Sequence, residues 1–501
     1  LKAISNTNLR GVNVVRKHYQ SQHRFDCSPI AQVELNLESR DEIVPILAGL
    51  QLVYTNNQLR HKAVKIVAAD LNEESRRDVG RPGMDDWHVV VLAAVRLGCN
   101  FDYDKLQDQV ENHRSLRGVM GIGDWQDADQ FTFRRIRDTL CNLKPATLEK
   151  LNNVIVEAGH TLAPEAATSV RADSFVVETN IHYPTESSLI FDGVRKFVPL
   201  CADLAGTLGI EGWRQSDHLT RKIKKLKQNI GRIAASKSPI KKDALKSLYG
   251  DLLARTDQLL TRADDLVKTA KSELSSMASV SQIAAIERWI ELTRQVADTA
   301  HRRVILGESV PNSEKLFSLF ETHTQLYRRG KAGQPNQYGR LVLVYEDGAG
   351  FISHYHLMDR ESKDQDVVVE QTRIAQRKHS GQIDTASFDR GFHSAENESS
   401  LQAVVDDVCV LPRAPGQYAE RLKSASVQFH QTRLRHSGVE SAIGALQRGN
   451  GLKRCRDRSE IGFERYFGLA VLGRNIHTLG KLLLAQRDAN SLPAQSRRQA
   501  A

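Results

Sequence analysis

The sequence lacks the long apolar run that a membrane-spanning helix requires. None of its hydrophobic stretches approaches the ~20 consecutive residues that cross a bilayer. The stretch that begins at Leu1 is polar and has no charged segment followed by an apolar core, so no secretory signal is recognisable there. These absences predict a soluble, cytoplasmic protein with no membrane partner.

Paired cysteines are also missing. The chain has six cysteines among 501 residues, with no CxxC pair and no clustered histidines. This scatter argues against a structural zinc site and a disulfide framework, and it predicts reduced thiols. The six are Cys27, Cys99, Cys141, Cys201, Cys409 and Cys455.

Acidic residues are fewer than basic ones. The 70 Lys and Arg against 60 Asp and Glu give a formal charge of +10, which favours a phosphate-rich partner but is also common in soluble proteins without one. The placement of the charge is more specific, because residues 219–246 hold ten Lys or Arg and a single acid, Asp243. We expect this segment to contact DNA, with Lys222 and Lys225 among the contacts. A solvated structural insertion is the alternative.

Three short motifs each offer one carboxylate in a setting that suits a metal ligand. They are ADSFVVETNIHYPTESS at 172–188, DTASFDRGFHS at 384–394 and RHSGVESAIGALQ at 435–447. Asp173 and Asp389 border short β-branched or apolar runs, and Glu440 opens an apolar-periodic helix, so one fold could bring the three together. Hard carboxylate oxygens select Mg²⁺ or Mn²⁺, and a pair of such ions suits phosphodiester chemistry.

Other acids near these motifs are candidates for the same places. The alternatives to Asp173 are Glu178, Glu186 and Asp192. The alternative to Asp389 is Asp384, and the nearby Glu396 and Glu398 are interpreted as ordinary surface acids. Asp389 is preferred because it ends a strand near Gly391, where the backbone can approach a substrate. His182 and His393 lie beside the motifs, but a single histidine is more often structural, and neither is assigned as a ligand.

Helical patterns dominate the first 165 residues. The expected helices lie at 43–53, 59–67, 87–97, 103–110 and 131–143. The turn-forming sequence RRDVGRPG at 76–83 divides an N-terminal helical region, 1–75, from a second helical block, 76–165. The last helix of this block carries three arginines on successive faces, which makes the block a candidate for binding DNA ends. They are Arg134, Arg135 and Arg137.

A strand and a long helical segment follow. The strand is expected to begin at Asp173, in a stretch rich in Val, Phe and Thr, and a helix is expected from Ser187. Residues 201–303 read as helical, with SKSPIKK at 236–242 as the main break. A heptad seam before the break predicts two antiparallel helices joined by a basic turn. The seam consists of Leu219, Ile223, Leu226, Ile230 and Ile233.

β-character returns after the helical segment. The expected elements are a hairpin of strands at 340–345 and 351–357, a helix at 364–378, strands ending near Asp389 and Pro412, and helices around Glu440 and at 463–484. Together with 166–200, residues 304–484 are expected to form one α/β catalytic domain, in which 201–303 is an inserted helical hairpin. The polar tail, 485–501, is expected to be disordered.

In these motifs the chain resembles the DDE transposases of bacterial insertion sequences, in particular a group from otherwise unclassified insertion sequences. The resemblance covers most of the chain. It rests on GRPGMDDWHVVVLAAVRL with DYDKL, VETNIHYPT, SVPNSEKLFSLFETHTQLYRRGKAG, DRGFHS and GVESAIGALQRGNGL. It implies a ribonuclease-H-like mixed sheet with flanking helices, interrupted by the helical insertion and preceded by helical N-terminal domains.

The resemblance also implies a reaction and its partners. Asp173, Asp389 and Glu440 would be the catalytic, metal-binding triad, holding two Mg²⁺ ions for which Mn²⁺ can substitute. The reaction would be cleavage of DNA at transposon ends, followed by strand transfer. The implied partners are double-stranded DNA with terminal inverted repeats, target DNA, and further copies of this chain in a homodimer or larger assembly on DNA.

One local pattern departs from the family. Many members surround the glutamate with Tyr-x2-Arg-x3-Glu-x6-Lys, and only the glutamate is kept here. The corresponding residues are Arg433, His436, Glu440 and Gln447. The seven-residue spacing puts Arg433 and Glu440 on one helical stripe, if one helix contains both. Candidates to supply the missing positive charge are Arg435, Arg448 and Lys453.

Two other functions share these features. A structure-selective nuclease would use the same metal chemistry without strand transfer. A catalytically inactive DNA-binding protein derived from a transposase would keep only the basic surfaces, although the presence of all three acids weighs against it. A serine or tyrosine recombinase is disfavoured, because no activated hydroxyl nucleophile stands out in the sequence.

Overall fold

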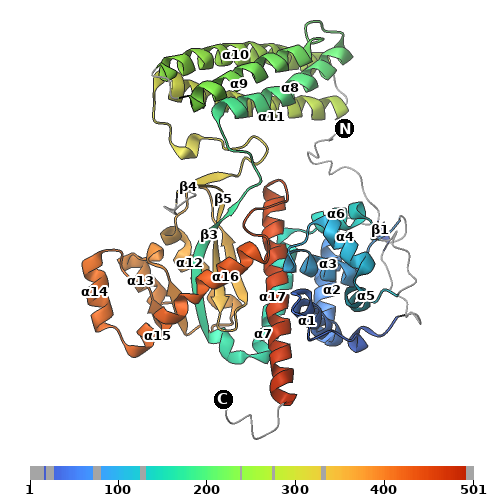
Figure 1. Ribbon diagram of the computed structural model, residues 1–501, viewed down its shortest axis with the longest axis vertical. Coiled ribbons are helices and arrows are strands. Elements are labelled where there is room, and N and C mark those ends of the chain that lie inside the picture. Colours follow the sequence, from blue (N-terminus) through green and yellow to red (C-terminus); the bar gives the residue numbers. More distant parts are fainter. Residues whose placement is uncertain are drawn as a thin grey trace. The chain divides into compact units, whose positions relative to one another are not determined.

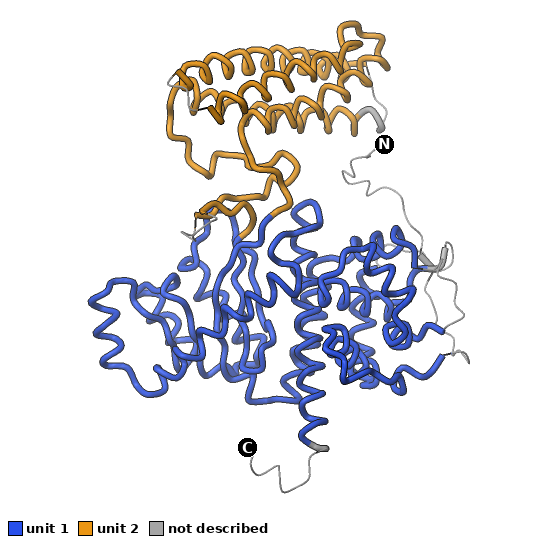
Figure 2. The backbone as a smooth tube through the Cα atoms, viewed as in Figure 1, with its two compact units in different colours: residues 1–178, 341–501 blue, residues 179–340 orange. Residues whose placement is uncertain are grey.

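The computed structural model describes residues 16–17, 27–71, 81–123, 131–236, 240–273, 277–328 and 335–491. The chain is a mostly helical α/β protein with a mixed six-stranded sheet and a helical N-terminal region (Figure 1). It forms two compact units, one of residues 1–178 and 341–501 and the other of residues 179–340 (Figure 2). Within the described ranges, no helix is both long enough and apolar enough to cross a membrane.

Short helices make up the N-terminal part of the first unit. The five helices expected here are present, as α1, α2, α3, α4 and α6, while α5 and α7 were not expected. Asp85 begins α3 by accepting a hydrogen bond from the backbone N of Trp87 (2.7 Å), and Gly121 ends α5 in the left-handed conformation. The elements are β1 (Arg16–Lys17), η1 (Ile30–Gln32), α1 (Ile43–Thr55), α2 (Asn57–Leu71), β2 (Arg81–Pro82), α3 (Asp86–Gly98), α4 (Tyr103–Asn112), α5 (Arg114–Met120), α6 (Phe133–Cys141), α7 (Pro145–Leu162) and η3 (Pro164–Thr168).

The six-stranded sheet has the order β4-β5-β3-β7-β8, with β6 paired to β5. β3 is parallel to β7 and β7 to β8, whereas β5 is antiparallel to β4 and β6. The strands are β3 (Ser169–Glu178), β4 (Gln325–Arg328), β5 (Asn336–Asp347), β6 (Ile352–Leu357), β7 (Thr385–Phe388) and β8 (Asp407–Cys409). The expected hairpin is confirmed as β5 and β6. The expected start of β3 at Asp173 is wrong, because Ser169 to Ala172 already pair with β7.

The helices of the C-terminal part complete the first unit. They are α12 (Asp364–Lys378), η6 (Arg390–Phe392), α13 (Ala395–Gln402), α14 (Pro415–Ser424), α15 (Val427–His436), α16 (Gly438–Arg448) and α17 (Glu460–Ser491). α12 has the expected bounds. α17 extends to Ser491, so the expectation of disorder from residue 485 is wrong for its first seven residues. The remainder of the tail, 492–501, lies outside the described residues.

α17 lies between the N-terminal helices and the sheet (Figure 1). It packs against α1, α3 and α7, and their apolar side chains join those of the sheet in one core. The contact with the sheet is also polar, because the Asn475 side chain accepts from the backbone N of Ile352 (2.8 Å) and donates to its carbonyl (2.9 Å). Asn475 also donates to Asn152 of α7 (2.6 Å), and both asparagines are fully buried. α17 therefore fixes α7 and β6 together.

The second unit is built on four long helices: α8 (Glu186–Leu208), α9 (Ser216–Ala235), α10 (Lys241–Glu273) and α11 (Met277–Ala300). The expected hairpin is present as α9 and α10, but it is one half of a larger bundle, since α8 packs on α9 and α11. A Cβ added at Gly193 of α8 would overlap the hydroxyl of Thr293 on α11, so these two helices approach closely. The bundle is followed by η4, a π-helix (His301–Leu306), and η5 (Asn312–Glu314).

The boundaries of this unit differ from the expected insertion at 201–303. The second unit runs from Thr179 to Arg340. It takes in α8, which the sequence pattern assigned to the catalytic domain. The physical reason is the shared core, because Leu189, Ile190 and Val194 of α8 are buried with the apolar residues of the bundle.

Gly480 of α17 tests the packing of the first unit. A Cβ at this position would overlap the backbone carbonyl of Pro45 in α1, so Gly480→Ala must push two backbones apart. We expect the free energy of unfolding to fall by about 1–3 kcal/mol, as in other overpacked cores. Gly416→Ala in α14 is the matched control, since nothing lies within 4 Å of its Cβ position. Equal stability of the two variants in chemical denaturation would contradict this account of the interface.

Candidate active site

Asp173 and Asp389 lie on neighbouring parallel strands. Asp173 is the fifth residue of β3, and Asp389 directly follows β7. Because Ala172 is paired with Phe388, these two acids are the next residues along the two strands. Neighbouring strands are ~4.8 Å apart. The register therefore brings the two backbones side by side at one end of the strand pair.

The loop that follows β7 holds Asp389 in place. Arg413 donates hydrogen bonds to the carbonyls of Arg390 (3.1 Å) and Gly391 (2.6 Å), which are the two residues after Asp389. In the described part of the chain, the exposed Asp389 carboxylate itself has no ion pair or side-chain hydrogen bond. Arg413 thus fixes the backbone of this loop and does not neutralise the carboxylate of Asp389.

Arg171 determines where α16 begins. It lies two residues before Asp173 on β3 and therefore shares its face of the sheet. Its guanidinium donates to Glu346 of β5 (2.5 Å) and to the carbonyl of Arg435 at the end of α15 (2.8 Å). A Cβ added at Gly438, the first residue of α16, would overlap this guanidinium. α16 therefore starts directly over the face of β3 that carries Asp173.

Glu440 is the third residue of α16 and is exposed. His436, at the end of α15, links this region to β7, since its Nδ1 lies 3.0 Å from the hydroxyl of Ser387. Burial and the charge of Arg171 lower the pKa of His436, while the carboxylates of Asp389 and Glu440 act in the opposite direction, and the net shift is downward. His436 is therefore neutral at pH 7, and both carboxylates lie within electrostatic reach of its ring.

The three acids share one face of the sheet, but they do not form a closed cluster. Among the described residues, no three His, Cys, Asp or Glu side chains are grouped as a metal site. The fit to a metal is therefore one of donor chemistry. Asp173, Asp389 and Glu440 offer only hard oxygen donors, which suit Mg²⁺ and Mn²⁺. Two of the three are exposed and thus accessible to an ion.

Most of the alternative acids are bound elsewhere. The ion pairs that hold them are Glu178 with Arg454 (3.2 Å), Glu186 with Arg303, and Asp192 with Arg195 (2.8 Å), and the nearby Glu398 pairs with Arg421 (2.8 Å). Glu396 is exposed on α13. Asp384 precedes β7 and donates its backbone N–H to the carbonyl of Thr168, so it lies at the opposite end of the strand from Asp389.

Two residues near the site, Arg171 and Asp364, escaped the sequence reasoning, and His436 was named there only as a departure from the family pattern. Asp364 begins α12, and its Oδ1 is buried without a hydrogen-bond partner. The other oxygen, Oδ2, lies 3.5 Å from the position of a Cβ added at Gly391, and Asp389 Oδ2 lies 4.0 Å from the same point. The glycine therefore leaves two carboxylates facing the same space. A glycine two residues after Asp389 was the only sequence signal for Asp364.

The proposed DNA-binding arginines of α6 differ in their surroundings. Arg134 is exposed. Arg135 donates to the carbonyl of Gly83 (3.2 Å), and Arg137 forms an ion pair with Asp138 (2.7 Å). Arg134 projects to solvent, whereas the guanidinium groups of Arg135 and Arg137 are engaged within the protein, so the capacity of this helix for phosphate is smaller than its sequence suggested.

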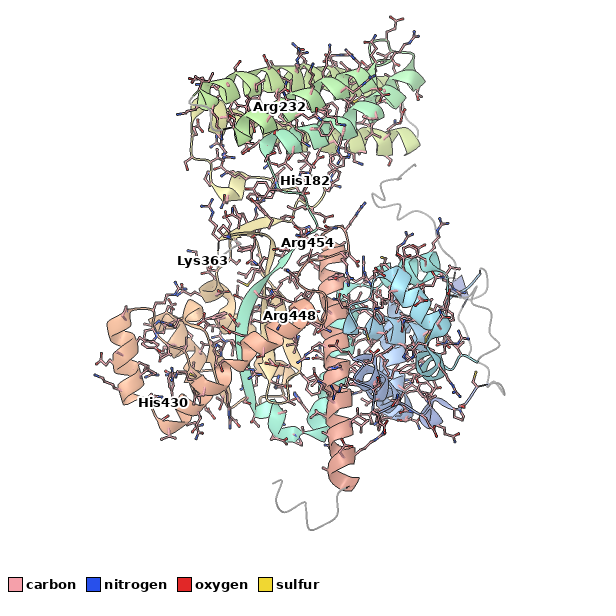
Figure 3. All side chains as sticks on the ribbon, in the orientation of Figure 1. His182, Arg232, Lys363, His430, Arg448 and Arg454 are labelled. Atoms are coloured by element: carbon pink, nitrogen blue, oxygen red, sulfur yellow. The ribbon has the colours of Figure 1, made fainter. Side chains whose placement is uncertain are left out.

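The other proposed DNA contacts are exposed. These are Lys222 and Lys225 on α9, Arg448 at the end of α16 and Lys453 just beyond it; Arg448 is labelled in Figure 3. The expected stripe of Arg433 with Glu440 on one helix is wrong. Ser437 separates α15 from α16, so the two residues belong to different helices.

The contact between Arg171 and Gly438 can be tested by a double-mutant cycle. Gly438→Ala should destabilise the protein by about 1–3 kcal/mol, because the new methyl group displaces a guanidinium held on two sides. In an Arg171→Ala background the same change should cost much less, with a coupling of about 0.5–3 kcal/mol in thermal or chemical unfolding. Gly444→Ala on the same helix is the control, since its nearest neighbour is the exposed end of Arg448. Additive effects would show that Arg171 does not set the start of α16.

Comparison with known proteins assigns no function to these residues. The chain matches no protein-family model, no curated protein and no solved structure.

Proposed function

We propose that this protein is a DDE-type transposase, which cuts DNA at the ends of a mobile element and transfers the cut strands into target DNA. The observation that carries the proposal is the register of β3 and β7. Ala172 pairs with Phe388, so Asp173 and Asp389 are the next residues on the two neighbouring strands. Glu440 comes from a helix that covers the same face of the sheet. Two strands and one helix thus supply three acids to one region.

The arrangement of the chain agrees with this proposal. The resemblance to DDE transposases implies a ribonuclease-H-like mixed sheet, an inserted helical segment and helical N-terminal domains. The chain has a mixed sheet, a helical unit between β3 and the hairpin of β5 and β6, and helices before the sheet. These features support the family assignment at the level of architecture.

The proposed cofactor is a pair of Mg²⁺ ions, for which Mn²⁺ can substitute. Asp173, Asp389 and Glu440 would hold them, because the set contains only hard oxygen donors. When bound, such ions supply a low-pKa water and electrostatic stabilisation of the phosphodiester that is attacked. No covalent protein intermediate is needed, so no hydroxyl or thiol nucleophile has to be present.

The protein's own side chains position the reacting groups. Arg171 fixes the start of α16 and hence Glu440. His436 stays neutral and hydrogen-bonded to Ser387, so it adds no positive charge that would compete for the carboxylates. Arg448, at the end of α16, is free of an ion pair in the described part of the chain and can bind a DNA phosphate. Lys453 offers a second exposed cation.

The proposed partners follow from this reaction. The substrates are double-stranded DNA with terminal inverted repeats and a second, target duplex. Two ends must be held at once, which favours a homodimer or larger assembly on DNA. Strand-transfer activity distinguishes a transposase from a nuclease with the same metal chemistry. Metal-dependent cleavage distinguishes it from an inactive DNA-binding protein.

The three acids provide the central test. We expect Asp173→Asn, Asp389→Asn and Glu440→Gln each to reduce Mg²⁺-dependent nicking of element-end DNA by about 100-fold or more, since each removes a metal ligand. DNA binding should persist, because the volume of each side chain is nearly unchanged. Nicking and strand transfer by the purified variants would be measured together with affinity in a gel-shift assay.

Asp384→Asn is the matched control for this series, because Asp384 lies at the far end of β7 and should tolerate the change. Nicking at the wild-type rate by any of the three variants would remove that residue from the triad. Cleavage without strand transfer would identify a nuclease, and binding without cleavage by the wild type would identify an inactive DNA-binding protein.

The basic surface of the α9–α10 hairpin provides a second test. Lys222, Lys224 and Lys225 of α9 and Lys242 of α10 are exposed, whereas Lys227 is half-buried over the ring of Phe191 (5.1 Å). Replacing the four exposed lysines by glutamine should flatten the slope of log K against log salt by roughly 0.9 per lost phosphate contact. The same four positions changed to arginine keep the charge and serve as the control. An unchanged slope in the glutamine variant would show that the α9–α10 hairpin does not contact DNA and is a solvated structural insertion.

A further inference from the structure

The second unit contains a cavity of about 290 Å³ that includes none of the candidate active-site residues. It is lined by the segment before α8, by α11 and η4, by the region around η5, and by β4 and β5. Its volume is close to the ~300 Å³ at which small-molecule pockets begin. The sequence analysis assigned no role to this part of the chain.

The lining of the cavity is positively charged. Three cations, Arg303, Lys315 and Arg328, face a single carboxylate, Glu186, which leaves a net charge of +2. Glu186 is already engaged with Arg303. Burial, followed by the charges of Arg303 and Arg328, lowers the pKa of Lys315. The three cations therefore lie close enough to repel one another, and a bound anion would relieve that repulsion.

Aromatic rings form another part of the lining. Tyr338 packs between Tyr183 and Phe317, with ring centroids 5.8 Å and 5.5 Å away. Phe317 is buried, whereas Tyr183 is 68% exposed. Burial of Tyr338, followed by its hydrogen bond with Tyr183, raises the pKa of Tyr338 to about 12, so the Tyr338 hydroxyl stays neutral at pH 7. An uncharged aromatic platform thus adjoins the cations.

We propose that this cavity binds a nucleotide 5′-phosphate, with the phosphate held by Arg303, Lys315 and Arg328 and the base stacked on Tyr183. A phosphate monoester carries about −1.5 to −2 charges at pH 7, which matches the net charge of the lining. Arginine forks suit its oxygens, and an exposed tyrosine ring suits the face of a base. A simple anion would use the cations but would leave the tyrosine without a role.

This inference does not depend on DNA cleavage, because it involves none of the three acids. The nucleotide can be a free mononucleotide or the 5′-phosphorylated end of a DNA strand, since both present the same groups to the cavity. The sequence around the cavity is rich in polar turns, and Asn312 and Asn336 add amide groups that can contact a sugar or a base edge.

The experiment is calorimetric titration of the full-length protein, without divalent metal, with thymidine 5′-monophosphate and with thymidine. We expect the monophosphate to bind at least ten times more tightly than the nucleoside. Lys315→Gln and Arg328→Gln should each weaken binding of the monophosphate at least tenfold. Tyr183→Ala, a change at an exposed ring, should weaken the monophosphate but leave binding of inorganic phosphate unchanged.

Lys268→Gln is the matched control, because Lys268 is an exposed lysine of the same unit outside the cavity. Short oligonucleotides with and without a 5′-phosphate distinguish the two sources of the ligand. Tighter binding of the phosphorylated oligonucleotide than of the mononucleotide assigns a DNA end, and the reverse assigns a free nucleotide. The proposal would be overturned if the monophosphate and the nucleoside bound equally, if neither bound, or if both charge variants kept full affinity. It would also be overturned if inorganic phosphate bound as tightly as the monophosphate and Tyr183→Ala had no effect.

Discussion

The close packing of α17 against α1 and α3 is the constraint on which the first unit depends. Gly473 of α17 meets Gly98 of α3, where an added Cβ would lie 2.6 Å from the Cα of its neighbour, and Gly480 approaches Gly49 of α1. Helices can come this close only where no side chain intervenes. Because α17 also binds β6 through Asn475, the glycines place the N-terminal helices and the sheet around one core. Any shift of α17 would move both.

Two buried charge contacts then fix the helix that carries Glu440. At its start, α16 rests on Arg171. Beyond its end, Arg96 of α3 forms two hydrogen bonds with Asp457 (2.6 and 3.1 Å) and lies over the ring of Tyr103 (3.9 Å). Burial acts to lower the pKa of Arg96, but the charge and hydrogen bonds of Asp457 outweigh it and the net shift is upward. A buried arginine without its partner would cost several kcal/mol, so the segment between α16 and α17 has little freedom to move.

Local patterns predicted the elements of this fold better than its contacts. The hairpin of β5 and β6 and the bounds of α12 followed from alternation, turn residues and helical spacing. The start of β3 was missed because Ser169 to Ala172 become a strand by pairing with β7, a contact that spans more than 200 residues of sequence. Asp173 and Asp389 could be named because each borders an apolar run. Arg171 and Asp364 could not, since only the contacts at Gly438 and Gly391 reveal them, and the link from His436 to Ser387 is likewise visible only in the fold.

In this basic protein, the hydrogen bonds of two nearby arginines explain why carboxylates remain available at the candidate site. Arg171 and Arg413 lie close to the acids, yet they donate to Glu346 and to backbone carbonyls. In the described residues, Asp389 and Glu440 form no ion pair, whereas most alternative acids do. Carboxylates held on one face of a sheet without counter-ions repel one another, which costs stability unless a cation binds. The proposed phosphate site of the second unit follows the same reasoning with opposite sign, since Arg303, Lys315 and Arg328 line one cavity with a single carboxylate, Glu186.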